Sequence, residues 1–395
     1  LPERHLLWSL AQDAVQPGLL FVGSEFGVFF TQDGGRHWHR FSRLPTLSFR
    51  DIEVQDRECD LVAASFGRGI FILDDYSPLR QAVAGLRQAL LLPARPALAY
   101  VPSQPLNLPG KGFQGDDIYL AANPPFGAVF TYYLSDSLRS SKARRQEEEK
   151  NMRLKGADIP FPGWERLRRE DSEDGPAVLL TVRDAEGGVV RRLGGPGDRG
   201  IQRVAWDLRY PDVEPVRLQE KSGSDPRDYT PLGPLVVPGA FSVTLEKMEN
   251  GNVEPLAPAM AFTVQSPGLN ALPDDDRTRV LAFQRKAGRL QRAMIGAGEA
   301  LDEALKRLGF IKKAIREFPV IDPALGAEAS RLEGQLRQFG RELNWDPTLG
   351  RRSEPQAPTL MQRLDLQLGS TAAITAGNQK NYELAASAFK VLLEK

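Results

Sequence analysis

The chain has 395 residues, more than a single domain of ordinary size, so two or three domains are expected. Its 51 basic and 51 acidic residues cancel, which removes the electrostatic reason to expect nucleic acid or an anionic membrane as the main partner. No apolar run approaches the ~18 residues needed to cross a bilayer, so no membrane span is expected. The single cysteine excludes an internal disulfide framework and a cysteine-rich zinc site.

The first hundred residues consist of short apolar runs separated by Gly, Asp and Pro, a pattern typical of short strands. Two segments repeat: residues 19–23 and 27–33 are echoed by residues 61–65 and 69–75, at an offset of ~42, within the period of four-stranded propeller blades. The first unit predicts four strands and the second three, at 5–10, 19–23, 27–31 and 38–41, and at 49–54, 61–65 and 69–73. The second unit therefore lacks an outer strand.

An Asp-box, Ser/Thr-x-Asp-x-Gly-x-x-Trp, lies between the third and fourth predicted strands, with Thr31, Asp33, Gly35 and Trp38 at its defining positions. The carboxylate of Asp33 can accept backbone N–H groups inside the turn, and glycine tolerates the positive φ of such turns. Trp38 is expected to be buried as an aromatic plug near the junction of the two units. This pattern indicates a folding role for the Asp-box and no catalytic one.

These segments, LLFVGSEFGVFFTQDGGRHW and DLVAASFGRGIFILDDYSPLRQ, resemble the last blades of bacterial BNR-repeat, sortilin-like (VPS10-type) propeller proteins often labelled glycosyl hydrolases. That family's second motif reads Thr-His-Gly-Arg-Gly, whereas residues 65–69 read Ser-Phe-Gly-Arg-Gly and lack the histidine. The resemblance implies a secreted or periplasmic protein and further upstream blades of the same polypeptide. The chain also begins without an initiator methionine or a signal segment, so we expect a C-terminal fragment.

The fold class expected is multidomain, mainly β plus α. After a partial propeller with its exit segment (1–100), the strand pattern of 117–265 is similar to an immunoglobulin-like sandwich of the flagellar hook-cap type, with Trp206 in its core. Its charged run, 135–156, predicts a solvated helical excursion or a mobile loop.

The last part, 274–395, shows helical spacing and predicts three antiparallel helices. The three apolar seams are Val280 to Phe318, Leu325 to Leu343, and a third through Met361, Leu364, Leu368, Tyr382, Ala385, Phe389 and Leu392.

Candidate site residues are few. The three histidines, His5, His37 and His39, have no metal-ligand spacing, so neither a metal nor a cofactor is expected. Glu25 and Arg68 precede strand residues and could face a ligand. Asp74 and Asp75 form a paired carboxylate, although Asp75 occupies the repeat position of Asp33 and also reads as a degenerate Asp-box member.

Glu25 and Asp75 are predicted to lie toward opposite ends of a blade, too far apart to cooperate. The sequence thus predicts no catalytic residues and favours a non-catalytic binding protein for a peptide, protein or glycan. The alternative is a sialidase-like glycoside hydrolase, with its catalytic residues mostly in upstream blades.

Overall fold

The computed structural model describes residues 1, 4–81, 87–102, 121–216, 232–268 and 272–394. Its internal contacts divide the chain into two compact units. The first comprises 1–97, 122–207 and 240–263, and the second comprises 98–121, 208–239 and 264–395. The start predicted for the second domain, residue 117, lies outside the described residues, and the three-domain division stays a prediction.

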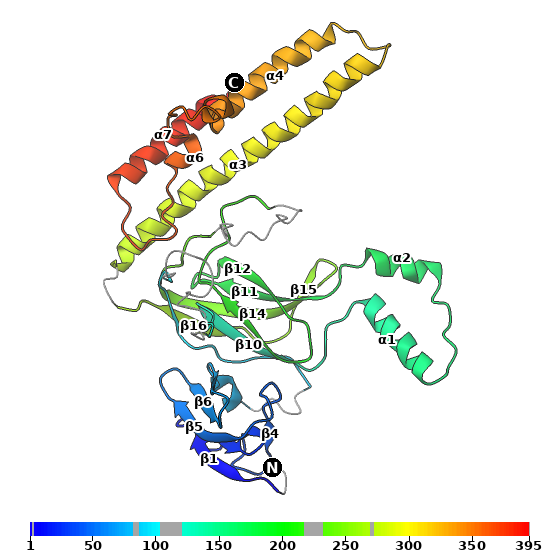
Figure 1. Ribbon diagram of the computed structural model, residues 1–395, viewed down its shortest axis with the longest axis vertical. Helices are drawn as coiled ribbons and strands as arrows, with labels where there is room; N and C mark the ends of the chain where they lie inside the picture. The colour runs from blue at the N-terminus through cyan, green and yellow to red at the C-terminus, as the bar shows by residue number, and fades with distance from the viewer. Residues whose placement is uncertain (2–3, 82–86, 103–120, 217–231, 269–271, 395) are drawn as a thin grey trace. The chain divides into compact units, whose positions relative to one another are not determined.

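Two small antiparallel sheets form from the first eighty residues (Figure 1). The first contains β1 (Leu7–Gln12), β2 (Leu20–Ser24), β3 (Gly27–Thr31) and β4 (His39–Arg40), in that order. The second contains β5 (Phe49–Gln55), β6 (Asp60–Ser65) and β7 (Ile70–Leu73), followed by the 3-10 helix η1 (Ser77–Arg80). The strands predicted from the sequence are present, with ends shifted by up to two residues.

The two sheets repeat one hairpin design. Ser24 Oγ donates to the carbonyl of Gly27 (2.9 Å) across the β2–β3 turn, and Ser65 Oγ donates to the carbonyl of Gly69 (2.7 Å) across the β6–β7 turn. The second turn has one residue more than the first, so β2 and β6 correspond at an offset of 41 and β3 and β7 at 42. The single offset of 42 expected from the sequence is therefore wrong for β2 and β6.

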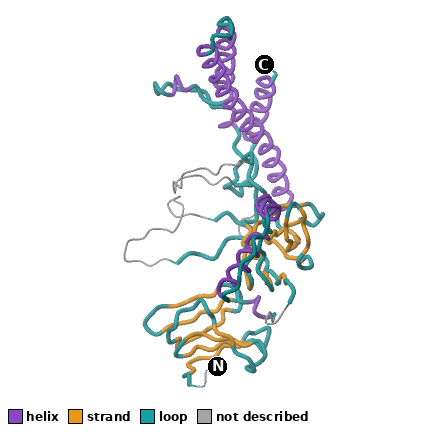
Figure 2. Tube along the Cα trace, turned by 90° about the vertical axis from the view of Figure 1, so that its right-hand side faces the viewer, coloured by secondary structure: helices purple, strands orange, loops and turns teal. Residues whose placement is uncertain are grey.

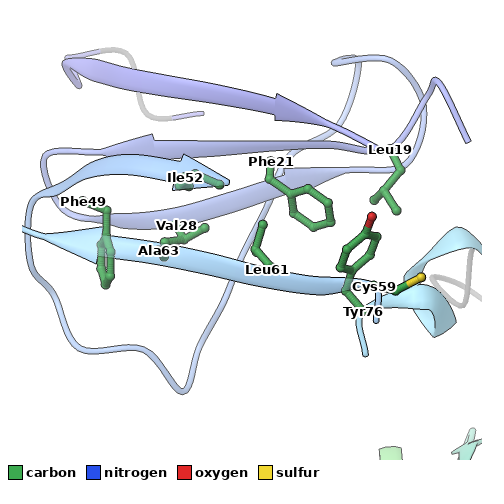
Figure 3. Close-up of a cluster of buried hydrophobic side chains, with 9 residues drawn as sticks. All are labelled: Leu19, Phe21, Val28, Phe49, Ile52, Cys59, Leu61, Ala63 and Tyr76. Carbon is green, nitrogen blue, oxygen red and sulfur yellow. The ribbon is translucent and has the colours of Figure 1, made fainter. Parts of the chain in front are cut away.

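A shared apolar core joins the two sheets, and Figure 3 shows its buried members. Equivalent strands contribute opposite faces to it: β3 contributes Val28 and Phe30, whereas β7 contributes Phe71 and Leu73. Since Val28 corresponds to Ile70 and Phe30 to Ile72, the second sheet directs the other face of its strand into the core. The sheets thus stack front to back.

Two further sheets follow in chain order, and their strands are orange in Figure 2. One has the order β13–β10–β8, and the other the order β12–β11–β14–β16–β9, with β15 paired to β14. The bounds are β8 (Leu90–Leu91), β9 (Ala97–Leu98), β10 (Ala128–Leu134), β11 (Ala177–Arg183), β12 (Val189–Gly195), β13 (Gly200–Trp206), β14 (Gly239–Glu249), β15 (Asn252–Pro255) and β16 (Met260–Gln265).

Trp206 is fully buried, as expected, with its ring edge-on to Phe241 (5.7 Å) and Phe262 (6.1 Å). Gly127 lies against the backbone of Trp206 and has a φ of +109°. A Cβ at this position would lie 1.8 Å from the Trp206 carbonyl oxygen, so only glycine fits here.

The charged insertion between β10 and β11 is helical. It contains α1 (Ser141–Leu154) and α2 (Trp164–Ser172). The helices are joined by Arg145, which lies 2.8 Å from the carboxylate of Glu170, while the same arginine also pairs with Glu149. Ion pairs therefore join two helices that bury no apolar side chain, and the helical alternative of the prediction is the correct one.

The second unit contains α3 (Asp274–Glu317), α4 (Leu325–Leu343), α5 (Pro347–Gly350), α6 (Leu360–Arg363) and α7 (Ala376–Leu393). α3 and α4 form an antiparallel hairpin, visible in yellow and orange in Figure 1. Their core with α7 includes Met294, Leu343 and Phe389. The first two predicted seams are present only in part. Ile311 and Phe318 of the first and Leu325 and Leu332 of the second are exposed, so neither seam is buried along its whole length.

The third predicted seam is wrong in its first part. Met361 belongs to the four-residue helix α6, and Leu364 and Leu368 follow it outside any helix. The long helix starts only at Ala376, where Thr375 caps the free N–H of Asn378 and Asn378 caps Thr375 in return. Among the helices of the described ranges, none combines the length and the apolar character that a membrane crossing requires.

Candidate functional site

A β-bulge recurs at the same position in the first strand of each small sheet. The pairing of β1 with β2 skips Trp8, between Leu7 and Ser9, and the pairing of β5 with β6 skips Arg50, between Phe49 and Asp51. The skipped residue of a bulge has no partner in the ladder, and its side chain is turned out of the regular alternation. Trp8 and Arg50 are therefore equivalent residues that the fold presents in the same way.

The two bulge side chains meet. The guanidinium carbon of Arg50 lies 3.6 Å from the centre of the Trp8 ring and 5.0 Å from that of Phe66, in the β6–β7 turn. Cation–π contacts of this kind favour a fixed position for the arginine. Trp8 is 40% exposed and Phe66 71%, so both rings remain open to solvent.

The turns beside the bulges are anchored alike. The N–H of Glu25 donates to the carbonyl of Leu6 (3.0 Å), and the N–H of Phe66 donates to the carbonyl of Ser48 (2.8 Å). Each bond ties a turn to the residue before the first strand of its sheet. Each turn also contains an exposed phenylalanine: Phe26 follows the anchored Glu25 in the first, and Phe66 is itself the anchored residue in the second. We call Trp8, Phe26, Arg50 and Phe66 the bulge face.

Two of the residues proposed from the sequence border this face. Glu25 is half-buried in the β2–β3 turn, and Arg68 is exposed in the β6–β7 turn. The bulge residues themselves were missed, because neither the aromatic nor the arginine carries a motif. Aligning the two repeats over the first strands would have placed Trp8 and Arg50 at one position, but it would not have shown the bulge.

Asp74 and Asp75 lie at the other end of the second sheet, after β7. The N–H of Asp75 donates to the carboxylate of Asp60 (2.9 Å), and the Asp75 carboxylate accepts from the hydroxyl of Ser77 (2.6 Å). Burial and the neighbouring Asp60 carboxylate raise the pKa of Asp74. The structure thus separates these carboxylates from Glu25, and Asp75 fixes a turn.

The Asp-box closes the β3–β4 connection. Asp33 Oδ1 accepts from the backbone N–H of His37 (2.9 Å) and from Thr31 Oγ (2.7 Å), while Oδ2 lies 2.6 Å from His37 Nδ1. These bonds hold the pKa of Asp33 well below its usual range. Trp38 Nε1 donates to the carbonyl of Gly35 (3.0 Å). The expectation of a buried Trp38 is wrong: the ring is half-buried and packs on its own turn.

A second constellation, buried in the shared core, joins Asp13, Tyr76 and Arg80. The Tyr76 hydroxyl donates to Asp13 Oδ1 (2.6 Å), and Arg80 donates to both carboxylate oxygens (2.9 and 2.7 Å). Burial opposes ionisation of Asp13, but these bonds and the Gln16 N–H outweigh it and lower its pKa to about 2. Burial and the Asp13 carboxylate raise the pKa of Tyr76.

This constellation resembles catalytic groups in residue type only. Asp13 is 2% and Tyr76 1% exposed, so a substrate cannot reach them, and a raised pKa keeps the tyrosine protonated. It instead ties the β1–β2 connection to the segment after β7. Across the described part of the chain, no cluster of His, Cys, Asp and Glu is arranged to hold a metal ion.

The searches of family models and of curated proteins returned no match. Among solved structures, the extracellular domain of a protein described as a hybrid two-component system of B. thetaiotaomicron is 10% identical, with a TM-score of 0.16, over 68% of this chain and 26% of that one. One described as a one-component system gives 10% identity and a TM-score of 0.15 over 67% and 26%. The chain thus spans about a quarter of those structures, and a likeness this weak supports no argument about fold or function.

Proposed function

We propose that the chain is a non-catalytic binding protein of the cell exterior, and that the bulge face contacts its ligand, a peptide, protein or glycan. The observation that carries the proposal is the contact of Arg50 with Trp8 and Phe66. Large aromatic and arginine side chains dominate binding energy at protein surfaces. Here they are exposed, and a repeated backbone feature holds them in place. The external location rests on the resemblance to secreted BNR-repeat proteins.

The two small sheets are proposed to be neighbouring blades of a propeller. Their front-to-back stacking supports this proposal, because it buries one face of each sheet and leaves the opposite face exposed. Another sheet of the same repeat could pack on each exposed face. Leu10 is 64% exposed, while its equivalent Ile52 is 3% exposed. Ile70 is 67% exposed, while its equivalent Val28 is fully buried. Further sheets of the same repeat, which are the upstream blades expected from the resemblance, would bury the exposed side chains of Leu10 and Ile70. The later strands and helices are proposed to form the immunoglobulin-like sandwich and a supporting bundle.

A glycoside hydrolase is the weaker proposal for this chain. Such enzymes need two opposed carboxyl groups, or a tyrosine nucleophile with its partners, in contact with the sugar. Glu25 and Asp75 lie at opposite ends of their hairpins, and Tyr76 is enclosed in the core. Among the described residues, the aromatic and arginine groups of the bulge face are exposed to solvent. The carboxylates of Glu25 and Asp75 and the hydroxyl of Tyr76 do not come together at one exposed site, which makes the hydrolase the weaker proposal.

Peptide and glycan arrays probed with the full chain test the proposed function. We expect ligands whose signal falls at least tenfold in Trp8→Ala and Arg50→Ala, because each change removes one half of the stacked pair. Arg36→Gln, which removes an exposed charge at the opposite end of β3, is the matched control. Signals that survive both substitutions would refute a role for the bulge face. Turnover of model glycosides abolished by Glu25→Gln or Asp75→Asn, with the fold intact, would favour the hydrolase.

A further inference from the structure

The bulge face allows the ligand to be narrowed to one chemical class. We infer that it binds an acidic peptide segment, with a side-chain carboxylate on Arg50 and apolar side chains against the phenylalanines of the two turns. This inference rests on the proposed binding function and goes further, since it assigns the group that Arg50 recognises.

The first argument concerns the free donors of Arg50. Its contacts with Trp8 and Phe66 use the face of the guanidinium, and within the described residues this group makes no hydrogen bond or ion pair. The N–H groups in the guanidinium plane therefore remain available. Their fork matches the two oxygens of a carboxylate, and a planar arginine already held by rings loses less freedom on binding.

The comparison within the chain supports this reading. Several other arginines in or near these two sheets donate to acceptors of the chain itself: Arg40 to Thr46, Arg80 to Asp13 and Arg95 to Glu58. Arg50 instead lies against two rings, at a bulge, and has no hydrogen bond or ion pair among the described residues. Its position is thus fixed without any use of its hydrogen-bonding capacity.

The second argument concerns what surrounds the guanidinium. The Phe66 ring, whose centre lies 5.0 Å from the guanidinium carbon, is 71% exposed. Phe26, in the equivalent turn, is 43% exposed and packs against the ring of His5 (5.0 Å), and neither phenylalanine carries a polar side-chain atom. Sugar hydroxyls need hydrogen-bonding partners, and stacking on Trp8 would compete with Arg50, which already covers one face of the indole. Apolar peptide side chains need no such partners. An acidic residue flanked by apolar ones therefore fits the bulge face better than an acidic glycan does.

The test uses the full chain labelled with 5-fluorotryptophan, and follows the Trp8 resonance by ¹⁹F NMR. The probes are acetyl-Phe-Glu-Phe-amide, its glutamine counterpart, and a glucuronate disaccharide. We expect the glutamate peptide to bind about tenfold more tightly than the glutamine peptide, the scale of a charge-assisted hydrogen bond. Arg50→Gln should abolish this preference, and Arg50→Lys should lose most of it because an ammonium lacks the fork.

Arg36→Gln should keep the preference, and unchanged hydrogen exchange of β2 and β6 reports that the core of the two small sheets is intact in every variant. Equal affinity for the two peptides, or a preference that survives Arg50→Gln, would overturn the acidic class while leaving a binding function. If the disaccharide binds at Trp8 more tightly than the glutamate peptide, the ligand is an acidic glycan and the assignment of a peptide ligand is refuted. If the Trp8 resonance responds to none of the three probes, this inference is refuted. Array signals that depend on Trp8 and Arg50 would in that case still support the binding function. If such array signals are also absent, the binding function is refuted as well.

Discussion

The buried carboxylate of Asp13 offers the sharpest test of how the two small sheets are held together. Its side chain is fully enclosed and receives both arms of Arg80, the Tyr76 hydroxyl and the Gln16 N–H. Removing one partner of a buried pair costs about 3–5 kcal/mol, because the other is left uncompensated. Arg80 is 23% exposed and can be partly hydrated, so Asp13→Ala should cost about 3 kcal/mol.

Hydrogen exchange with mass spectrometry on the full chain measures this loss where it occurs. A loss of about 3 kcal/mol should accelerate exchange roughly 100-fold in peptides from β2 and β6. Tyr76→Phe removes one hydrogen bond, about 1 kcal/mol, and should accelerate it about fivefold. Glu53→Gln, at an exposed position of β5, is the control. If Asp13→Ala accelerates exchange less than threefold, the buried pair does not join the sheets.

The same carboxylate predicts a pH dependence. Its pKa in the folded chain, about 2, lies below the ordinary value of 3.8, so the unfolded chain binds the proton more readily. The stabilisation is therefore complete above about pH 4 and is lost as the pH falls toward 2, by roughly 2 kcal/mol. Asp13→Asn has no carboxylate to protonate, so its stability gap to the parent chain should narrow over that window. A constant gap would contradict the assignment.

Two further predictions concern backbone positions. Asp33→Ala should speed exchange of the turn amides up to His37, and Asp33→Asn should restore part of the protection because its oxygen can still accept; equal effects of both changes would exclude an acceptor role. Gly127→Ala should lower stability by about 2–6 kcal/mol in thermal unfolding, since backbone strain adds to the overlap with Trp206. Gly187→Ala has a similar positive φ in open space, and an equal loss there would mean that the overlap is relieved.

The local elements could be predicted from the sequence because their signals are local. Short apolar runs closed by glycine and aspartate give the strands from β1 to β7 within two residues, and the Asp-box gives its turn. The one-residue difference between the β2–β3 and β6–β7 turns was not foreseen, since the repeat still aligns acceptably by residue type. The prediction of the third helical seam was wrong in its first part for a related reason. The helical spacing of apolar residues already runs through 361–368, but the helix begins only after its N-cap, Thr375.

The candidate site could be predicted only at its border. Glu25 and Arg68 were singled out because they stand in turns before strands, which a sequence shows. Trp8 and Arg50 become partners only when two strands in different sheets pack together and both carry a bulge. The Asp13–Arg80 pair, 67 residues apart, likewise depends on tertiary contact and leaves no trace in spacing or composition.

In a repeated fold, the residues of a strand must both form the sheet and supply the side chains that bind a ligand. The bulge assigns these two roles to different positions. Every other position along β1 and β5 is constrained by strand pairing or by the core, so its residue type is restricted by folding. The bulge residue is exempt, and the same position holds an indole in one copy and a guanidinium in the next. This side chain can therefore differ between repeats without a change in strand pairing, and the surface chemistry can change while the scaffold stays the same. Because Trp8 and Arg50 are in contact, a change in one repeat also alters the surroundings of the bulge residue in the next.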